Sequence, residues 1–460
     1  MIGHPARLDT DALEAAAFRP IFSPGRWFWP VAALLAIIVL GGVAAFVYQF
    51  TEGMWVAGYS DRAFYGIYEA NLVAFIGVSY GGAVVSAVLR LVNARWGAPL
   101  SRMAEAMAVV ALIVGGAFAI VHLGRPERVF LILISGNLSS PIVWDFLAIT
   151  IYLTATVIFL YLPLIPDMAR LRDRLPTASF RGRLSRMLAI RWQGLDEQRQ
   201  RLRWGIAIVA ILVVPLAVSV HSVLAYTFSM TTRPGWHSTI FGPYFVVGAL
   251  YSGVGLVILV VAAFRRAYRL EAFITPRQIL SLAWMMAALG LVYLYLTFSE
   301  LLTTAYAGTR EELPVVVTLL EGAYAPAFWG FIAFGLLAPI ALIALPTRRR
   351  VAALALAAAF AVVGMWLKRL LITLPSSTLP LIDDAGPWGT AVFTWVPLLI
   401  TAAATAGIAL GLMLLFRFVP ILAIDEIEEA AAAEAAARGE AAADDTPRPA
   451  LAAPTPEGIA

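Results

Sequence analysis

Apolar residues gather in ten long stretches that short polar segments separate. Each stretch has roughly 20 residues or more, enough to cross a bilayer as a helix. We expect spans near 27–50, 64–91, 103–122, 141–164, 204–230, 239–264, 278–306, 324–346, 351–373 and 394–416. The first is too long for the core of a signal peptide and is followed by no small-residue cleavage site, so we expect it to be retained.

Composition supports a membrane location. Of the 460 residues, 61% are hydrophobic and 13% are charged, whereas soluble proteins have about 25% charged residues. The sequence therefore predicts an all-α integral membrane protein of about ten transmembrane helices. The net charge is +4, and the positive charge is unevenly placed along the chain, which indicates membrane orientation and not nucleic-acid binding. Since the chain has no cysteine, it cannot hold a thiolate-ligated iron–sulfur cluster or zinc ion, form a disulfide or use a cysteine nucleophile.

Basic residues alternate between the connections. One set of loops carries 19 of them and comprises 92–102, 165–203, 265–277 and 347–350, whereas the loops of the other set carry 5 in total. Basic loops stay in the cytoplasm. The even number of spans then places both termini in the cytoplasm, and the protein in the bacterial cytoplasmic membrane. We expect the ten arginines of 165–203 to meet lipid headgroups; docking of an acidic partner is the alternative.

Three segments follow from this pattern. Residues 1–26 form a cytoplasmic N-terminal segment, 27–423 a membrane domain, and 424–460 an acidic, Ala- and Pro-rich tail. We expect the start of this tail to add a helical turn or two and the tail to be largely disordered beyond about residue 440. Spans two to five and six to nine both begin outside, so any duplication would be parallel. Tyr80-Gly81-Gly82 in span two and Tyr251-Ser252-Gly253 in span six fit such a repeat and equally fit close helix packing.

Ionisable residues inside spans are functional candidates, because an unpaired charge in lipid costs several kcal/mol. Most lie in the outer half of their spans: Glu69, His122, Asp145, His221, Glu300, Lys368 and Arg369. Glu105, near the inner end of span three, is the main exception. A polar cavity that opens outward explains this distribution.

Quinol oxidation is the chemistry that fits such a cavity. A histidine and a carboxylate can accept the two protons of a quinol as its electrons leave. For Asp145, Glu300, Lys368 and Arg369 the alternative is a helix-end side chain that reaches the interface. Haem ligation by His122 and His221 is disfavoured, because His221 lies roughly 13 Å below the outer end of its span and His122 lies at the end of its own.

Several motifs resemble one family of membrane subunits. The segments are His122-Leu-Gly-Arg125-Pro, Ser140-Pro-Ile-Val-Trp-Asp145-Phe, Val220-His221-Ser-Val, Pro234-Gly-Trp-His237-Ser-Thr-Ile-Phe, Ser299-Glu300-Leu and Arg417-Phe-Val-Pro420. Together they resemble the polysulfide reductase (PsrC-like), NrfD-type subunits over about residues 60–425, and most closely the ActC-type subunit of alternative complex III.

The resemblance implies a fold of two four-helix bundles, near 64–230 and 239–373, with flanking helices. It implies a haem-free subunit that binds menaquinone or ubiquinone near the outer surface, with His122 and Asp145 as the proton-accepting pair. His221, His237 and Glu300 fall on the matching motifs and would line the pocket or a proton route. We expect the same role for the other candidates, which are Arg125, Tyr226, Glu69, Lys368, Arg369 and Glu105. The implied partners are an iron–sulfur subunit on the outer face, a paralogous membrane subunit and cytochrome c subunits.

One departure and several alternatives remain. Tyr226-Thr227 stands where close relatives are expected to have a Trp-Asp pair, so a second carboxylate is missing there. A quinone-reducing anchor of a molybdopterin enzyme would use the same site with electrons flowing the other way. Proton pumping through Glu105, a secondary transporter and a non-catalytic scaffold are further alternatives; transporter sites usually lie at the midplane.

Overall fold

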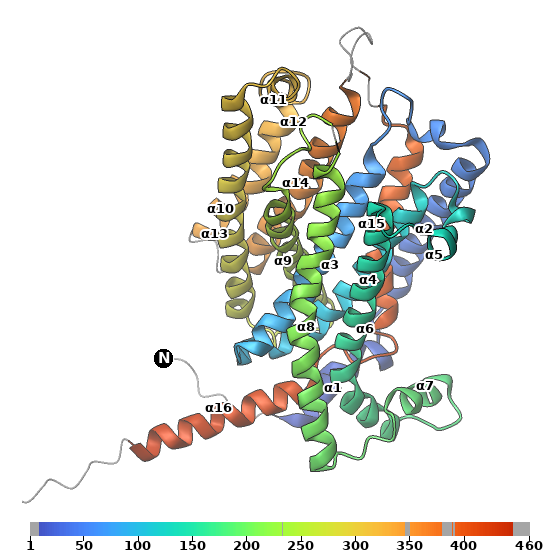
Figure 1. Cartoon of the computed structure of the whole chain (residues 1–460). Coiled ribbons are helices and arrows are strands. Elements are labelled where there is room, and N and C mark those ends of the chain that lie inside the picture. The colour runs from blue at the N-terminus through green and yellow to red at the C-terminus, as the bar shows by residue number, and fades with distance from the viewer. Residues whose placement is uncertain (1–8, 232, 346–349, 380–388, 390–391, 445–460) are drawn as a thin grey trace, which may run out of the picture.

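The fold is all-α in the computed structural model, which describes residues 9–231, 233–345, 350–379, 389 and 392–444 (Figure 1). Ten candidate membrane spans occur in this part of the chain, as predicted. They are α2 (Phe28–Glu52), α3 (Ile67–Leu91), α4 (Ala98–Val121), α6 (Pro141–Arg174), α8 (Asp196–Ser229), α9 (Phe241–Ala267), α10 (Pro276–Ala307), the composite α12 (Ala325–Gly330), η4 (Phe331–Leu337) and α13 (Ala338–Ala344), then α14 (Val351–Thr378) and α15 (Trp395–Leu415).

In chain order, eight of these spans form two consecutive groups of four. In the first group, α3 contacts α4 and α8, and α6 contacts both of these helices. In the second group, α9 contacts α10 and α14, and the composite span lies against both of these helices. The two groups also contact each other, because α9 packs against α3 and α8, and α14 packs against α3. Gly77 of α3 therefore lies close to both His221 of α8 and Arg369 of α14.

Two glycines form the crossing between α3 and α9. A Cβ atom on Gly81 would lie 2.1 Å from the carbonyl carbon of Gly253, and one on Gly253 would lie 2.4 Å from the amide nitrogen of Gly81. No side chain fits at such distances, so both positions require glycine. Close packing thus accounts for the small residues that suggested a repeat.

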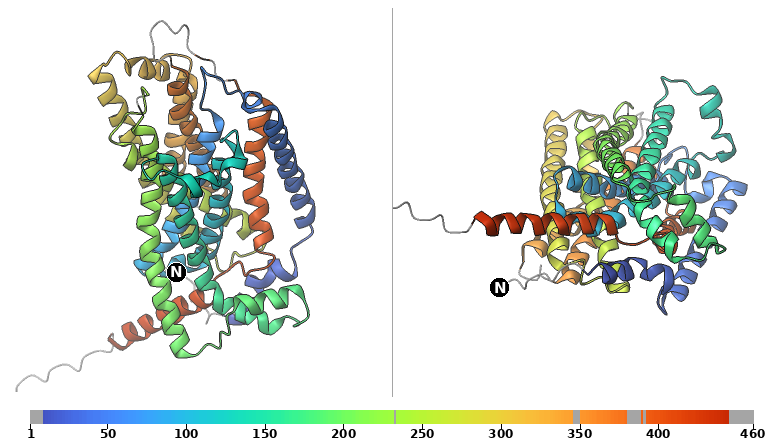
Figure 2. Two further views of the ribbon diagram at one scale, coloured as in Figure 1. Left: turned by 45° about the vertical axis from the view of Figure 1, so that its right-hand side comes forward. Right: turned by 90° about the horizontal axis from the view of Figure 1, so that it is seen from below.

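The remaining spans, α2 and α15, pack on each other beside the two groups (Figure 2). Within its most apolar window, α2 is only 17% buried. Its outward surface is almost entirely aliphatic and aromatic, as a lipid-facing helix requires. A cleft, described below, separates this pair from α9 and α14.

The arginine-rich end of the molecule carries three further helices, α1 (Thr10–Phe22), α7 (Phe180–Leu188) and α16 (Ile424–Asp444), as Figures 1 and 2 show. Asp9 caps α1 by accepting a hydrogen bond from the amide of Ala12. The segment 165–203, predicted as a loop, is largely helical, because α6 continues to Arg174 and α8 begins at Asp196. The helices therefore continue past the apolar stretches into polar sequence, which hydropathy alone does not reveal.

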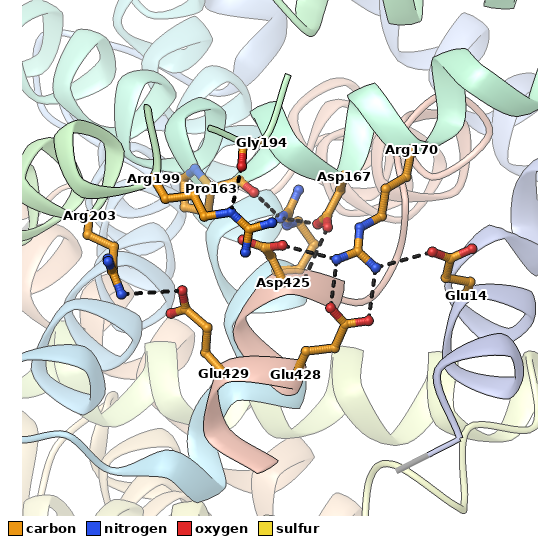
Figure 3. Close-up of polar contacts among 11 residues, drawn as sticks. Glu14, Pro163, Asp167, Arg170, Gly194, Arg199, Arg203, Asp425, Glu428 and Glu429 are labelled. Carbon is orange, nitrogen blue, oxygen red and sulfur yellow. Dashed lines mark hydrogen bonds and ion pairs between the residues drawn. The ribbon is translucent and has the colours of Figure 1, made fainter. Parts of the chain in front are cut away.

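The start of the C-terminal tail also differs from the prediction. Residues 424–444 form α16, a longer helix than the one or two turns expected at the start of the tail; residues 445–460 lie outside the described residues. Arg170 holds the helix start, with its guanidinium 2.6 Å from Glu428 and 3.1 Å from Asp425 (Figure 3). Arg170 also pairs with Glu14 of α1 at 3.1 Å. These ion pairs offset the charge of an acidic segment that would otherwise repel itself.

Candidate functional site

His122 lies where α4 ends, at the end of the molecule opposite the arginines. Its Nδ1 is 2.8 Å from the carbonyl oxygen of Phe118. Because that carbonyl can only accept, Nδ1 carries the proton, and Nε2 of the neutral ring is left as an acceptor. Gly124 follows with φ of +67°, a conformation that favours glycine, and Pro126 prevents continuation of the helix. The local sequence therefore fixes this imidazole at a helix end.

Asp145 occupies the second turn of α6 at the same end. Pro141 begins the helix at a position where no amide donor is needed. The Oδ1 atom of Asp145 is buried and has no hydrogen-bond partner among the described residues. Asp145 thus has an unsatisfied acceptor oxygen, and no hydrogen bond or ion pair within the described chain joins it to His122.

Tyr65 belongs to a group of aromatic rings at this end of the molecule. Burial raises the pKa of Tyr65, and the charges of Glu69 and Asp145 raise it further. The ring centroid of Tyr65 lies 5.6 Å from that of Trp236 and 6.4 Å from that of Phe228. Trp236 is fixed by a 2.7 Å hydrogen bond to the carbonyl of Ile372. Aromatic rings such as these can stack on a flat aromatic ligand.

Glu69 is held at the start of α3. Its carboxylate accepts hydrogen bonds from the Tyr59 hydroxyl at 2.7 Å and the Gly66 amide at 2.8 Å. Burial and the charge of Glu69 raise the pKa of Tyr59 well above its usual value, so Tyr59 remains a donor. These contacts make Glu69 a helix-capping residue, and the sequence had not suggested this role.

Glu300 and Lys368 form a second polar group, deeper in the molecule. The Lys368 Nζ lies 3.7 Å from Glu300 Oε2 and 5.3 Å from the ring centroid of Tyr244. Tyr244 stacks on Tyr293 at 4.5 Å. Lys368 and Arg369 are 3% and 4% exposed and lie about 13–15 Å from the end of α14 at 1.5 Å per residue. Both side chains are therefore buried within the protein.

His221 lies between the two groups of helices, and it is fully buried. Neither ring nitrogen has a hydrogen-bond partner in the described chain, and the same holds for the hydroxyls of Tyr80 and Tyr152. The His221 ring is 4.8 Å from the Tyr80 ring. A Cβ atom on Gly77 would lie 3.3 Å from His221 Nε2 and 3.6 Å from an Arg369 nitrogen. Four buried polar atoms in one region therefore have no hydrogen-bond partner among the described residues.

Three predicted residues lie at the surface. Arg125 and His237 are exposed, and Tyr226 is 41% exposed, with its hydroxyl against Gly242. His237 lies near Glu312. Burial raises the pKa of the Glu312 carboxyl, and a positive charge on His237 opposes that rise. The structure does not bring these three side chains to Asp145 by any contact among the described residues.

Glu105 belongs to the arginine-rich end and not to this site. Its carboxylate accepts a hydrogen bond from Ser86 at 2.7 Å and pairs with Arg90. Arg90 also pairs with Glu426 of α16 at 2.6 Å. One helical turn before Glu105, Arg102 forms a fully buried ion pair with Asp167 at 2.8 Å. Arg102 and Asp167 were missed because both fall in predicted loops; the only signal was their position next to a span.

The fold and the site define an all-α integral membrane protein with a histidine, a carboxylate and aromatic rings at one membrane end. Residues 55–380 match the model of the polysulphide reductase NrfD family. The chain belongs to that family.

Curated relatives agree with this assignment. A Halobacterium salinarum protein provisionally named as a membrane subunit of a dimethyl sulfoxide reductase is 29% identical, over 89% of this chain and 95% of its own length. One selenate reductase subunit of Mesobacillus selenatarsenatis is 23% identical, over 83% and 91%. An Hdr-like menaquinol oxidoreductase integral membrane subunit of Archaeoglobus fulgidus is 25% identical, over 72% and 75%. The chain is thus related to membrane subunits of oxidoreductase complexes.

Proposed function

We propose that this chain is the quinone-interacting membrane subunit of an oxidoreductase complex and that His122 and Asp145 accept the protons of a quinol. The observation that carries the proposal is that each of these two side chains has an acceptor atom without a hydrogen-bond partner among the described residues. Hydrogen bonding of Nδ1 to Phe118 leaves His122 Nε2 as an acceptor, and Asp145 Oδ1 is buried without a partner in the described chain. Two such acceptors near one membrane end match the two hydroxyl protons of a quinol.

Orientation follows from the arginines. The end that carries α1, α7 and α16 is cytoplasmic under the positive-inside rule, so the His122 end faces outward, in the bacterial cytoplasmic membrane. Protons from the quinol then leave towards the outside. The chain has no cysteine and so cannot hold a thiolate-ligated iron–sulfur cluster. The electrons of the quinol therefore pass to a partner, an iron–sulfur subunit docked on the outer loops. The chain supplies binding and proton transfer, and the partner supplies electron transfer.

Two assemblies can use this site. In one, of the alternative complex III type, quinol is oxidised and the electrons leave through the iron–sulfur subunit towards cytochrome c subunits. In the other, a molybdopterin enzyme exchanges electrons with the quinone pool through its iron–sulfur subunit. Relatives named for dimethyl sulfoxide and selenate reductases support the second assembly as much as the menaquinol oxidoreductase relative supports quinol chemistry. The reduction potentials of the partner subunits decide the direction of electron flow.

Quinol turnover by the purified complex tests the proposal. We expect His122→Ala and Asp145→Asn each to lower kcat by about 100-fold or more, the usual contribution of a positioned acid or base, with assembly unchanged. Asp196→Asn is the control, since Asp196 is an exposed carboxylate at the opposite, arginine-rich end of the molecule. Undiminished turnover in an intact His122→Ala complex would place the quinol site elsewhere.

A further inference from the structure

A large cleft separates the α2–α15 pair from α3, α9 and α14. Its volume is about 880 Å³, within the range of ligand sites. Side chains such as Phe75, Leu256, Val362 and Ile408 make its walls almost entirely apolar. The cleft extends from Arg26 and Trp27, at the arginine-rich end, to Arg369 deep in the molecule. It does not include His122 or Asp145, so it is distinct from the proposed quinol site.

Arg369 is the one charged side chain deep in this cleft among its described lining residues. Its guanidinium is buried, with the whole residue 4% exposed, and it donates a 3.2 Å hydrogen bond to the carbonyl of Met365 in its own helix. In the described chain no aspartate or glutamate forms an ion pair with it, since the nearby Glu300 pairs with Lys368. A buried cation without a counter-ion is costly. Hydrogen-bond acceptors of a ligand would offset that cost.

Other polar groups at the deep end already have partners. Ser252 donates to the carbonyl of Gly248 at 2.9 Å, and Thr401 donates to that of Pro397 at 2.7 Å. Arg369 therefore differs from its neighbours, because most of its five N–H donors lack an acceptor among the described residues. A ligand head here needs acceptor oxygens and no donors.

The shallow end suits a hydrocarbon chain that leaves towards the bilayer. Trp27 is 67% exposed, and the Arg26 guanidinium lies 5.5 Å from its ring centroid. An aromatic ring and an arginine are typical of the membrane interface. A ligand here thus needs a long apolar chain and a flat or compact head with acceptor oxygens.

We propose that this cleft is a second binding site for a lipid quinone, with a ring carbonyl oxygen against Arg369 and the isoprenoid chain along α9 and α15. The choice of a quinone over another lipid rests on the proposed function, which already brings quinones to this protein. A phospholipid would place its phosphate at the shallow end and leave Arg369 facing an acyl chain. The chemistry of the deep end favours the quinone.

Photolabelling of the purified complex with an azidoquinone tests this site. In the wild type we expect label on peptides of α14 and α15, mapped by mass spectrometry. Ala409→Phe fills the cleft from α15, and Leu259→Trp fills it from α9; each should lower that label at least fivefold. Ala402→Phe is the matched control, because Ala402 is an exposed residue of α15 that does not line the cleft, and its label should equal that of the wild type.

Further measurements separate the outcomes. Arg369→Met should lower the label as the filling variants do, and Arg369→Lys should retain part of it. Equal labelling in all variants, or a phospholipid and no quinone released from this cleft in native mass spectrometry, would overturn the second site. Failure of the proposed function gives a different result, namely full quinol turnover in His122→Ala. The two proposals can therefore fail independently.

Discussion

Arg102 donates to the carboxylate of Asp167 across 2.8 Å in a site where both side chains are fully buried. The pair joins the start of α4 to the end of α6, and Asp167 also accepts from the backbone of Asp425 at 3.4 Å. One ion pair therefore connects two membrane helices to the start of α16.

Removing one member of this pair should be strongly destabilising. Asp167→Asn leaves the Arg102 charge buried and unpaired, and we expect a loss of about 3–5 kcal/mol. Replacing both residues, with Arg102→Met and Asp167→Leu, should recover most of it. Thermal unfolding in detergent measures both effects. Glu197→Gln is the control, since it breaks the exposed pair of Glu197 with Arg201 and should cost about 1 kcal/mol or less; equal losses in the two single variants would contradict the argument.

Gly81 should not tolerate a side chain. Gly81→Ala places a methyl group against the backbone of Gly253, so α3 and α9 must separate, at a cost of about 1–3 kcal/mol. The melting temperature in detergent should fall. Gly330→Ala is the control, because nothing lies within 4 Å of a Cβ atom there, and alanine in a helix is favoured by about 0.5–1 kcal/mol. A Gly81→Ala protein as stable as the wild type would show that the crossing can adjust.

The Tyr59 hydroxyl should make the stability of the folded protein depend on pH in the alkaline range. Its pKa is raised by burial and by Glu69, so the folded state keeps this proton when the unfolded chain, with a pKa of about 10, begins to lose it. The stabilisation is complete below about pH 10 and declines above it. Melting temperatures between about pH 8 and 11 should show a decline that is shallower in Tyr59→Phe. An identical slope in the two proteins would assign the decline to other groups.

Arg170 should control whether α16 stays attached. Arg170→Glu replaces attraction to Asp425 and Glu428 with repulsion. Such charge-assisted bonds are worth roughly 1.5–3 kcal/mol, and less here because Arg170 is partly exposed, so amide exchange across residues 424–430 should accelerate by about tenfold. Arg186→Glu, on an exposed position of α7, should leave exchange unchanged. Unaltered exchange in Arg170→Glu would mean that packing of Ile424 holds the helix.

The sequence was informative where lipid dictates the pattern. Apolar length alone located all ten spans, since in a bilayer each backbone polar group must be satisfied within its own helix. Helix ends beyond the apolar stretches were missed, because water permits both helix and loop there. That error made Arg102 and Asp167 appear to be loop residues, and it placed Lys368 too close to an end of α14.

Side-chain environments were harder to predict than helices. Residue type and approximate height did not distinguish Glu69 from Asp145, and only the motif resemblance singled out Asp145. The structure gives Glu69 two donors and leaves Asp145 Oδ1 with none among the described residues. The difference depends on Tyr59 and Gly66, which precede α3 in an irregular segment. Pairwise contacts of this kind follow from loop geometry, and no periodicity in the sequence encodes them.

The pairing of α2 with α15 also bears on biosynthesis. Among the spans that the structure describes, α2 is synthesised earliest and α15 latest, and the two pack against each other with residues 53–394 between them. At a translation rate of about 5–20 residues per second, α2 remains in the bilayer for roughly 17 to 70 s before its partner exists. Its aliphatic surface suits this delay, because lipid can solvate the helix until α15 arrives.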